Sequence, residues 1–331
     1  MELRARTAQV YPQFSITEPL SPDGSQRRIF RGVWAGRRAL LFLPSPGPLG
    51  LAEAAAFWAI GSHLSRLSLP VPRPLWHHPA HGAVVVEEKQ GALLQELVGE
   101  EGPHRCRPLL LRTLERAAAM AWEGARGFRA EWCWETPVYD SQVALQAEAR
   151  YFLHWVGRRL VGLPRPLLEA AHGEAARLAR RVDRLPTGLF LHRDLQSRNI
   201  IVDQGGEPWF IDYQGGRLGP FGYDLVSLIF DAYLGLPGAV KRELLEGAVE
   251  LGRELGCFGS SDEGLEQLRL LALFRSLQAG GAFAKLGWFR GKGWFKPHLP
   301  GVLATLAGLL RDHPSLPALR EAVERVREVV G

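Results

Sequence analysis

Two short segments near the middle of the chain carry the polar residues best suited to catalysis. The first fits the pattern H-R-D-x-x-x-x-N and places Asp194 five positions before Asn199. The second ends an apolar stretch with Asp212. Phosphoryl transfer needs a carboxylate at the attacking hydroxyl and oxygen ligands for a divalent metal. The pattern therefore predicts that Asp194 accepts or orients the hydroxyl proton and that Asn199 and Asp212 bind Mg²⁺.

A β-hairpin is expected to bring these residues together. Residues 199–202 and 209–211 predict two short strands, and residues 202–208 supply a glycine-containing turn between them. Asn199 and Asp212 then lie at the same end of the hairpin, close to Asp194. The alternative is a surface turn that these side chains only cap. Three polar residues at one end of one ribbon favour the catalytic interpretation.

The segment after Asp212 indicates the class of substrate. Only eleven residues lie between Asp212 and Asp224, where an apolar helix begins, capped by Asp224 or a neighbour. A protein kinase has a long activation segment here that ends in A-P-E, and no A-P-E occurs in this sequence. The chain therefore lacks the platform that would seat a peptide, which favours a kinase for small molecules.

The residues from Leu191 to Tyr233 resemble the aminoglycoside phosphotransferase and choline kinase-like superfamily. Within it they look most like the bacterial anomeric N-acetylmuramate/N-acetylglucosamine kinases of cell-wall recycling. The matching segments are 192–199, 211–215, 223–228 and 231–233, with weaker matches at 139–140, 274–278, 281–283 and 298–300. The resemblance implies an α+β, bilobal protein-kinase-like fold with a small β-rich N-lobe and a larger helical C-lobe. It also implies ATP and Mg²⁺ as cofactors and an amino sugar as the acceptor.

The predicted elements fit this order. Residues 1–20 predict a helix or an irregular lead, unless they supply the first strand. Strands are predicted within 24–34 and at 38–43, 70–76 and 82–87, with a helix over 51–67. Helices are predicted over 112–121, 142–160, 167–184 and from 224 nearly to the end. We therefore divide the chain into an N-lobe (1–87), a hinge (88–91) and a helical C-lobe (92–331) that holds the catalytic loop.

The N-lobe lacks one residue that protein kinases use. They place a lysine on the third strand to hold the α- and β-phosphates of ATP, whereas no lysine precedes Lys89 in this chain. Arg27 or Arg28 is predicted to take its place through a bidentate guanidinium contact, with Glu53 as a partner from the helix. The alternative is that both arginines are surface residues. The neighbouring loop, 23–26, holds one glycine and is a poor phosphate loop.

Further residues are assigned around the nucleotide and the catalytic loop. Glu87, Glu88 and Lys89 follow an apolar strand, and their backbone groups are expected at the edge of the adenine. His192 and Arg193 are expected to be structural residues near the site, with Arg193 joining the catalytic loop to its surroundings. As in similar kinases, Asp224 should hold the backbone of that loop.

The candidates for the acceptor side flank the catalytic ribbon or fall in the matching segments. They are Gln196, Gln214, Arg217, Tyr223 and Arg275. An acceptor that carries an amine usually needs an acidic pocket, and Arg217 favours a neutral or acidic sugar instead. Two alternatives stay open: an aminoglycoside or amino-alcohol phosphotransferase, and a nucleotide-binding pseudokinase that acts as a regulatory module. The missing strand lysine weakly favours the pseudokinase, whereas the complete set of catalytic polar residues argues against it.

Composition limits the remaining possibilities. The 331 residues are enough for about two domains of ~150 residues. Hydrophobic residues make up 46% of the chain, which is enough for a large core. No run approaches the roughly 18 apolar residues of a membrane span, and no apolar segment of a signal peptide follows Met1. Three scattered cysteines fit a reducing cytoplasm. The net charge is +5 without a long basic run, so neither nucleic acid nor a membrane is an expected partner, and no obligate protein partner is evident.

Overall fold

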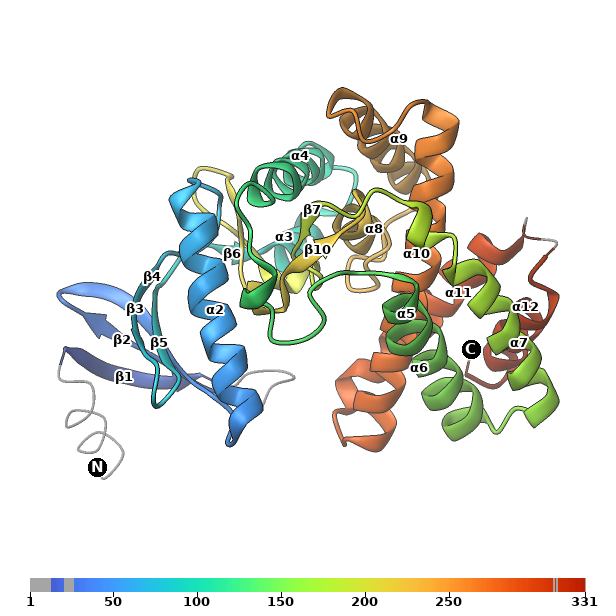
Figure 1. Ribbon diagram of the computed structural model, residues 1–331, viewed down its shortest axis with the longest axis horizontal. Helices are drawn as coiled ribbons and strands as arrows, with labels where there is room; N and C mark the ends of the chain where they lie inside the picture. Colours follow the sequence, from blue (N-terminus) through green and yellow to red (C-terminus); the bar gives the residue numbers. More distant parts are fainter. Residues whose placement is uncertain (1–12, 21–26, 312, 314, 331) are drawn as a thin grey trace.

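The computed structural model describes residues 13–20, 27–311, 313 and 315–330. They form a small part, built from a β-sheet and one long helix, and a larger part that is mostly helical (Figure 1). The elements of the small part are β1 (Phe14–Leu20), β2 (Arg28–Trp34), β3 (Arg37–Leu43), α2 (Pro48–Arg66), β4 (Pro74–His78) and β5 (Ala83–Glu87). This is the two-lobed α+β architecture that the sequence predicts.

The sheet of the small lobe is antiparallel, with the strand order β1-β2-β3-β5-β4. Successive residues of a strand face opposite sides, so each strand contributes to two clusters. Val85 of β5 packs with Phe14 and Phe30 on one face of the sheet. Val84, its neighbour, packs on the other face in the core that α2 shares with the larger lobe.

The lead of the chain differs from the first interpretation of the sequence. Residues 14–20 are a strand and not a helix or an irregular segment, and they pair with β2 from Phe14 opposite Trp34 to Leu20 opposite Ile29. Apolar and polar residues alternate at the start of this strand, the period of an edge strand with one buried face. Residues 1–12, on which the same prediction fell, lie outside the described part.

Helix α2 joins the small lobe to the segment that follows Asp212. A Cβ added at Gly61 of α2 would lie 2.4 Å from the Tyr213 hydroxyl, so only glycine allows this close approach. The Tyr213 hydroxyl donates a hydrogen bond to the Pro72 carbonyl at 3.1 Å, and its ring packs against Phe57 of α2 with the ring centroids 4.9 Å apart. The helix that carries Glu53 is therefore fixed relative to Asp212.

Residues 88–91 connect β5 to β6 (Ala92–Leu93), and they are the predicted hinge. Strand β6 pairs with β8 (Ile200–Val202), which pairs in turn with β9 (Pro208–Phe210). A Cβ at Gly91 would lie 2.1 Å from the Val202 carbonyl oxygen, so the connection passes directly over the catalytic hairpin. That the lobes move about these residues stays a prediction.

The larger lobe is helical apart from that sheet and the pair β7 (Leu189–Leu191) and β10 (Arg217–Gly219). Its helices are α3 (Leu94–Glu101), α4 (Arg107–Gly124), α5 (Ser141–Val143), α6 (Arg150–Phe152), α7 (Arg165–Ala179), α8 (Tyr223–Ile229), α9 (Gly238–Glu254), α10 (Ser261–Ala284), α11 (Leu299–Arg311) and α12 (Pro317–Val330). Shorter 3₁₀ turns lie at Ala130–Trp132, Val182–Arg184, Ser197–Asn199, Tyr213–Gly215 and Gly293–His298. The helix predicted over 142–160 contains π-helical turns at Ala144–Ala149 and Leu153–Val161, and a third lies at Lys285–Phe289.

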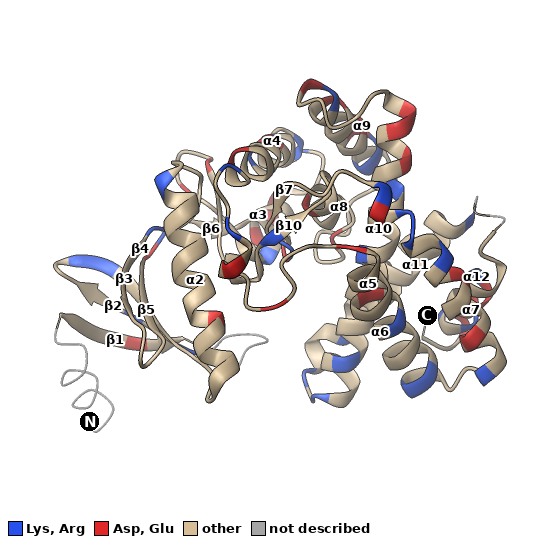
Figure 2. Ribbon diagram, viewed as in Figure 1, with Lys and Arg blue, Asp and Glu red and all other residues tan. Residues whose placement is uncertain are grey.

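Helix α10 is the centre of the larger lobe. It packs against α8, α9 and α11, and its residues are buried on several faces, as expected of a central helix with weak amphipathicity. Basic and acidic residues are mixed on the outer helices α7, α9 and α12 (Figure 2). Within the described ranges, no helix unites the length and the apolar run needed to cross a membrane.

Candidate active site

The hairpin β8–β9 has the predicted geometry. Ile200 lies opposite Phe210, and the Ile211 N–H donates to the Asn199 carbonyl at 2.9 Å just beyond the last pair. Asn199 and Asp212 therefore leave the hairpin at the same end. At the other end, the Asp203 carboxylate fixes the turn by accepting from the Gly205 N–H and from the indole of Trp209, each at 2.9 Å.

The loop that carries Asp194 is held from α8 by a buried carboxylate. Asp224 accepts the His192 N–H at 2.6 Å and the Arg193 N–H at 2.9 Å. Burial raises the pKa of Asp224 to about 7, against the opposing effect of these two hydrogen bonds. Arg193 has a φ of 77°, a left-handed conformation that is costly for a residue with a side chain. The two hydrogen bonds to Asp224 keep the loop in this conformation.

His192 supports the loop from inside. Its ring is buried, and burial lowers its pKa and keeps the imidazole neutral. Nε2 lies 3.0 Å from the Ile211 carbonyl oxygen. Because a carbonyl only accepts, Nε2 carries the proton and donates it to the strand that precedes Asp212. His192 thus links the catalytic loop to the second strand of the hairpin.

Asp194 and Asn199 are brought together as the sequence predicts. The Asn199 amide nitrogen donates to the Asp194 carbonyl at 2.8 Å, so the amide oxygen of Asn199 is not used in this hydrogen bond. The Asp194 side chain is 32% exposed and open to a substrate. Burial acts to raise its pKa, but the charges of Arg193 and Arg275 outweigh this effect and keep the pKa below its ordinary value. Asp194 is therefore ionised at neutral pH, as a proton acceptor must be.

Asp212 forms an ion pair with the small lobe. Its Oδ1 lies 2.6 Å from an Arg27 guanidinium nitrogen, and a second nitrogen of that guanidinium lies 3.7 Å from Glu53 Oε1. Asp212 has a φ of 67°, a left-handed conformation that ends the extended backbone after β9. Arg27 thus joins the helix of the small lobe to the end of the catalytic hairpin, and Glu53 is the partner that the sequence analysis suggested.

The oxygen atoms around Asp212 fit a magnesium ion that also contacts phosphates. The Gln214 amide oxygen is buried and lacks a hydrogen-bond partner among the described residues, and the Gln214 amide nitrogen donates to Asp212 at 3.1 Å. Together with Asn199, these residues offer one carboxylate and two amide oxygens. No group of three or more His, Cys, Asp or Glu side chains in the described ranges could hold a metal alone. Mg²⁺ typically takes one or two carboxylates and completes its shell with waters and substrate phosphates.

The two arginines proposed for the phosphates have different surroundings. Arg27 has a side chain that is only 11% exposed, and it lies between Glu53 and Asp212. Arg28 is exposed at the start of β2, and its side chain makes no ion pair among the residues described. The structure therefore places Arg27, and not Arg28, in the site. The loop 23–26, predicted to be a poor phosphate loop, lies outside the described residues.

We predict that Arg27→Ala raises the KM for ATP by about tenfold or more, because one charge-assisted hydrogen bond contributes about 1.5–3 kcal/mol. The KM for the acceptor should change far less. Arg28→Ala is the matched control, since it removes the same charge one residue away. Steady-state kinetics with ATP as the varied substrate measure both variants. An unchanged KM for ATP in each single variant and in the double variant would show that other groups hold the phosphates.

The side chains of the hinge residues are used within the protein. Glu88 forms ion pairs with Arg31 and with Arg38 of the small-lobe sheet. Lys89 forms an ion pair with Glu87, and its ammonium lies 3.3 Å from the centre of the Trp209 ring. The N–H groups of Glu87 and Glu88 donate to the Arg73 and Arg38 carbonyls. Contact between this backbone and an adenine stays a prediction.

Three of the five acceptor candidates lie behind the site and not at its surface. Arg217 and Tyr223 are 2% exposed and Arg275 is 7% exposed. The Arg217 guanidinium is engaged by Glu135 and Thr136, and Arg275 donates to the Ser227 hydroxyl. The sequence argument that Arg217 presents donors to a sugar therefore does not hold for this conformation.

The other two candidates are placed differently. Gln196 is partly exposed and lies next to Asp194. Its N–H donates a hydrogen bond to the Asp194 carbonyl at 3.0 Å. Gln214 is buried and faces Asp212. Gln196 therefore remains the predicted acceptor contact, whereas Gln214 lies beside Asp212, a predicted metal ligand.

A buried carboxyl group lies beneath the site. Glu148 accepts hydrogen bonds from the hydroxyls of Tyr139 and Tyr223, each at 2.5 Å. Burial raises the pKa of Glu148 to about 7, while the two hydrogen bonds and the nearby Arg275 act in the opposite direction. Tyr223 is thus bound to Glu148 one position before Asp224, the residue that holds the catalytic loop, and Arg275 adds a nearby positive charge.

Sequence reasoning missed three contributions to the site. Asp231 accepts the Ser197 N–H at 2.7 Å and anchors the second half of the catalytic loop. The Arg198 guanidinium lies 4.3 Å from the centre of the Trp294 ring, which ties that loop to the C-terminal helices. Glu135 forms an ion pair with Arg193. The sequence offered a reason to choose only Asp231, because this residue falls in a segment that matches the family. The other two contacts join residues that are far apart in the chain.

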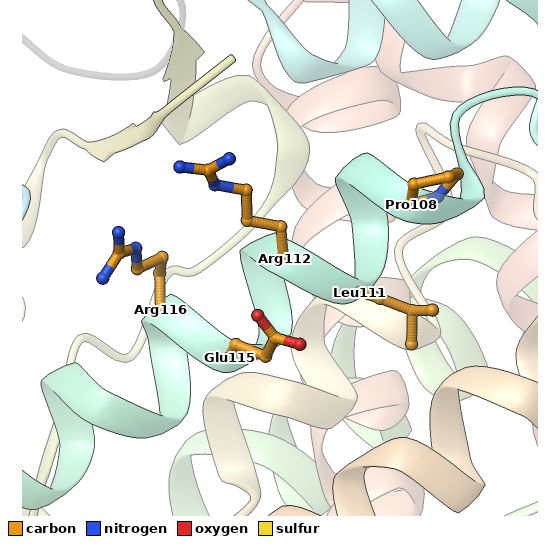
Figure 3. A pocket seen from close by; sticks show the side chains of 5 residues that line it. All are labelled: Pro108, Leu111, Arg112, Glu115 and Arg116. Carbon is orange, nitrogen blue, oxygen red and sulfur yellow. The ribbon is translucent and has the colours of Figure 1, made fainter. Parts of the chain in front are cut away.

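A large hollow of about 540 Å³ lies elsewhere, on the outer side of α4. Figure 3 shows its lining, which is formed by Pro108, Leu111, Arg112, Glu115 and Arg116. Arg112 and Arg116 each form an ion pair with Glu207, at 2.6 Å. Glu207 belongs to the turn of the catalytic hairpin, at the end opposite to Asn199 and Asp212, so this hollow is separate from the catalytic residues.

Comparisons with known proteins identify the family of this chain. A family model described as "Phosphotransferase enzyme family" matches residues 16–257. N-acetylmuramate/N-acetylglucosamine kinase from Neisseria meningitidis is 25% identical over 94% of this chain and 90% of its own length. The kinase of the same name from Pseudomonas aeruginosa is 25% identical over 92% of this chain and 86% of its own length. A solved aminoglycoside phosphotransferase, in ternary complex with ADP and hygromycin B, shares the fold with a TM-score of 0.61 at 18% identity, covering 91% of this chain and 98% of that one. The chain belongs to the phosphotransferase enzyme family.

Proposed function

We propose that this phosphotransferase transfers the γ-phosphoryl group of ATP, with Mg²⁺, to the anomeric hydroxyl of an N-acetylated amino sugar. The observation that carries the sugar is the 25% identity over 94% of the chain to a kinase named for N-acetylmuramate and N-acetylglucosamine. The phosphoryl transfer itself is supported by the position of Asp194, Asn199 and Asp212 at one end of the hairpin. Use of ATP is supported by a protein of the same fold that was solved in complex with ADP. A reaction that uses ATP would fit the reducing cytoplasm expected from the scattered cysteines.

The residues of the site have separate parts in this reaction. Asp194 orients the sugar hydroxyl and accepts its proton as the oxygen forms a bond to the γ-phosphorus and ADP leaves. Asn199 and Asp212 would hold Mg²⁺, which supplies positive charge to the phosphates when bound. Arg27 adds a guanidinium on the side of the small lobe. Asp224 and Asp231 hold the backbone on either side of Asp194 and so keep the base in place.

The acceptor is best tested by its hydroxyls. The anomeric hydroxyl is more acidic than an ordinary alcohol, so it needs less help from Asp194 to become a nucleophile. We expect ATP consumption with N-acetylmuramate or N-acetylglucosamine, and a ³¹P NMR signal of an anomeric phosphate. The methyl glycoside should not react, whereas a sugar blocked at the 6-hydroxyl should. The reverse pattern would move the reaction to another hydroxyl.

The same panel of acceptors distinguishes the two alternatives. Activity confined to aminoglycosides or amino alcohols would replace the sugar while keeping phosphoryl transfer. The argument from Arg217 no longer separates these acceptors, because Arg217 is neutralised by Glu135. Binding of ATP without turnover of any alcohol would favour the pseudokinase.

A further inference from the structure

Glu135 lies between two arginines beside the catalytic loop. Its Oε2 is 3.0 Å from an Arg193 guanidinium nitrogen and 2.7 Å from an Arg217 guanidinium nitrogen. The Glu135 side chain is 34% exposed and the Arg193 side chain is 27% exposed, so both lie at the edge of the site. Arg217 is buried and adds a second fixed charge. The carboxylate therefore has two cationic partners that restrict its position.

The segment that carries Glu135 is docked on β10, next to Arg217. The Leu218 N–H donates to the Pro137 carbonyl at 3.0 Å, and the Tyr139 N–H donates to the Leu218 carbonyl at 2.8 Å. These two hydrogen bonds form a parallel bridge between Val138 and Leu218. Because backbone bonds hold the segment, Glu135 is presented to the catalytic loop from a defined direction.

Arg193 has two carboxylates within reach, and they compete for it. The same guanidinium nitrogen that lies 3.0 Å from Glu135 lies 3.9 Å from Asp194 Oδ2. The backbone of Arg193 is left-handed, with a φ of 77°, and the Cβ atom of this side chain lies next to Asp194 in the chain. Without Glu135, Asp194 is the carboxylate that remains within 4 Å of the guanidinium among the residues that the structure describes. A close pair would occupy the oxygen that has to receive the proton of the substrate.

We propose that Glu135 is a positioning residue that holds Arg193 away from Asp194 and so keeps an oxygen of the base free for the acceptor hydroxyl. This inference rests on the proposed function, since it gives Asp194 the role of proton acceptor. Arg193 in its observed place still stabilises the ionised carboxylate at 3.9 Å without a close hydrogen bond.

The test compares Glu135→Gln with a double variant. Glu135→Gln should lower kcat by about 10- to 100-fold, the rate equivalent of one charge-assisted hydrogen bond, and leave the KM for the acceptor within about threefold. Adding Arg193→Gln removes the group that captures the base. The double variant should therefore turn over faster than Glu135→Gln alone, although slower than the wild type. Glu135→Asp should restore part of kcat.

A control and two outcomes decide the inference. Thr136→Val removes another partner of Arg217 from the same segment and leaves the pair of Glu135 with Arg193, so its kcat should stay near that of the wild type. Thermal melting confirms that each variant is folded. Unchanged kcat in Glu135→Gln, or a double variant slower than Glu135→Gln, would overturn the inference. A wild type that phosphorylates no sugar would overturn the proposed function instead, which the acceptor panel shows separately.

Discussion

Asp194→Asn is expected to lower kcat by about 10²–10⁴-fold, the usual contribution of a positioned general base. Asparagine has nearly the same shape, and the hydrogen bond from Asn199 goes to the Asp194 backbone, so the loop should keep its fold. The amide cannot accept the proton of the hydroxyl. Nucleotide affinity should change little, because Asp194 is not assigned to the metal. Single-turnover kinetics with saturating ATP and sugar measure the loss directly.

Asp203→Asn is a matched control for this substitution. Asp203 lies on the same hairpin, at the turn, where it binds the Gly205 N–H and the Trp209 indole. Asp203→Asn also replaces a carboxylate by an amide, but at the end of the hairpin opposite to the catalytic residues. It should therefore lower thermal stability and leave kcat near the value of the wild type. Near-normal turnover in a folded Asp194→Asn variant would remove Asp194 from the role of base.

The parts of the site that are local in sequence could be predicted. Asn199 and Asp212 flank a hairpin whose strands and turn together comprise about a dozen residues. The proximity of Asn199 and Asp212 therefore follows from chain geometry. The loop anchor at Asp224 follows from the family resemblance. The strands β2 to β5 and α2 follow from apolar patterning and turn residues. For residues 14–20 a strand was only the alternative prediction, because the apolar alternation there is short.

The contacts between distant segments could not be predicted from spacing. Arg27 and Asp212 are 185 positions apart, and only the folded chain shows that Arg27, and not Arg28, reaches the site. A one-residue shift on a strand reverses the face of a side chain, so a pair of adjacent arginines leaves the choice open. Sequence proximity also misled the choice of acceptor residues. Arg217 and Tyr223 flank the ribbon in sequence, but both side chains are buried, and they are bound by Glu135 and Glu148 respectively.

Asp212→Ala is expected to abolish the magnesium-dependent part of ATP binding. A carboxylate is the main charged ligand that a kinase offers the metal, and Asp212 is the carboxylate at the end of the hairpin. The substitution also releases Arg27, which keeps Glu53 as a partner. The protein should therefore stay folded, with a modest loss of stability. Thermal shift with ATP plus Mg²⁺, compared with ATP plus EDTA, isolates the contribution of the metal.

Asn199→Ala serves as the graded comparison for the metal site. Asn199 is neutral and is the second proposed ligand beside Asp212, so its loss should weaken the magnesium-dependent shift without removing it. The magnesium-dependent thermal shift should be largest in the wild type, smaller in Asn199→Ala and smallest in Asp212→Ala. For Asp212→Ala, the shift with ATP plus Mg²⁺ should equal the shift with ATP plus EDTA. The order follows from charge, because a carboxylate contributes a full negative charge to Mg²⁺ and an amide contributes only a dipole. A full magnesium-dependent shift in Asp212→Ala would place the metal at other ligands and leave Asp212 only as the partner of Arg27.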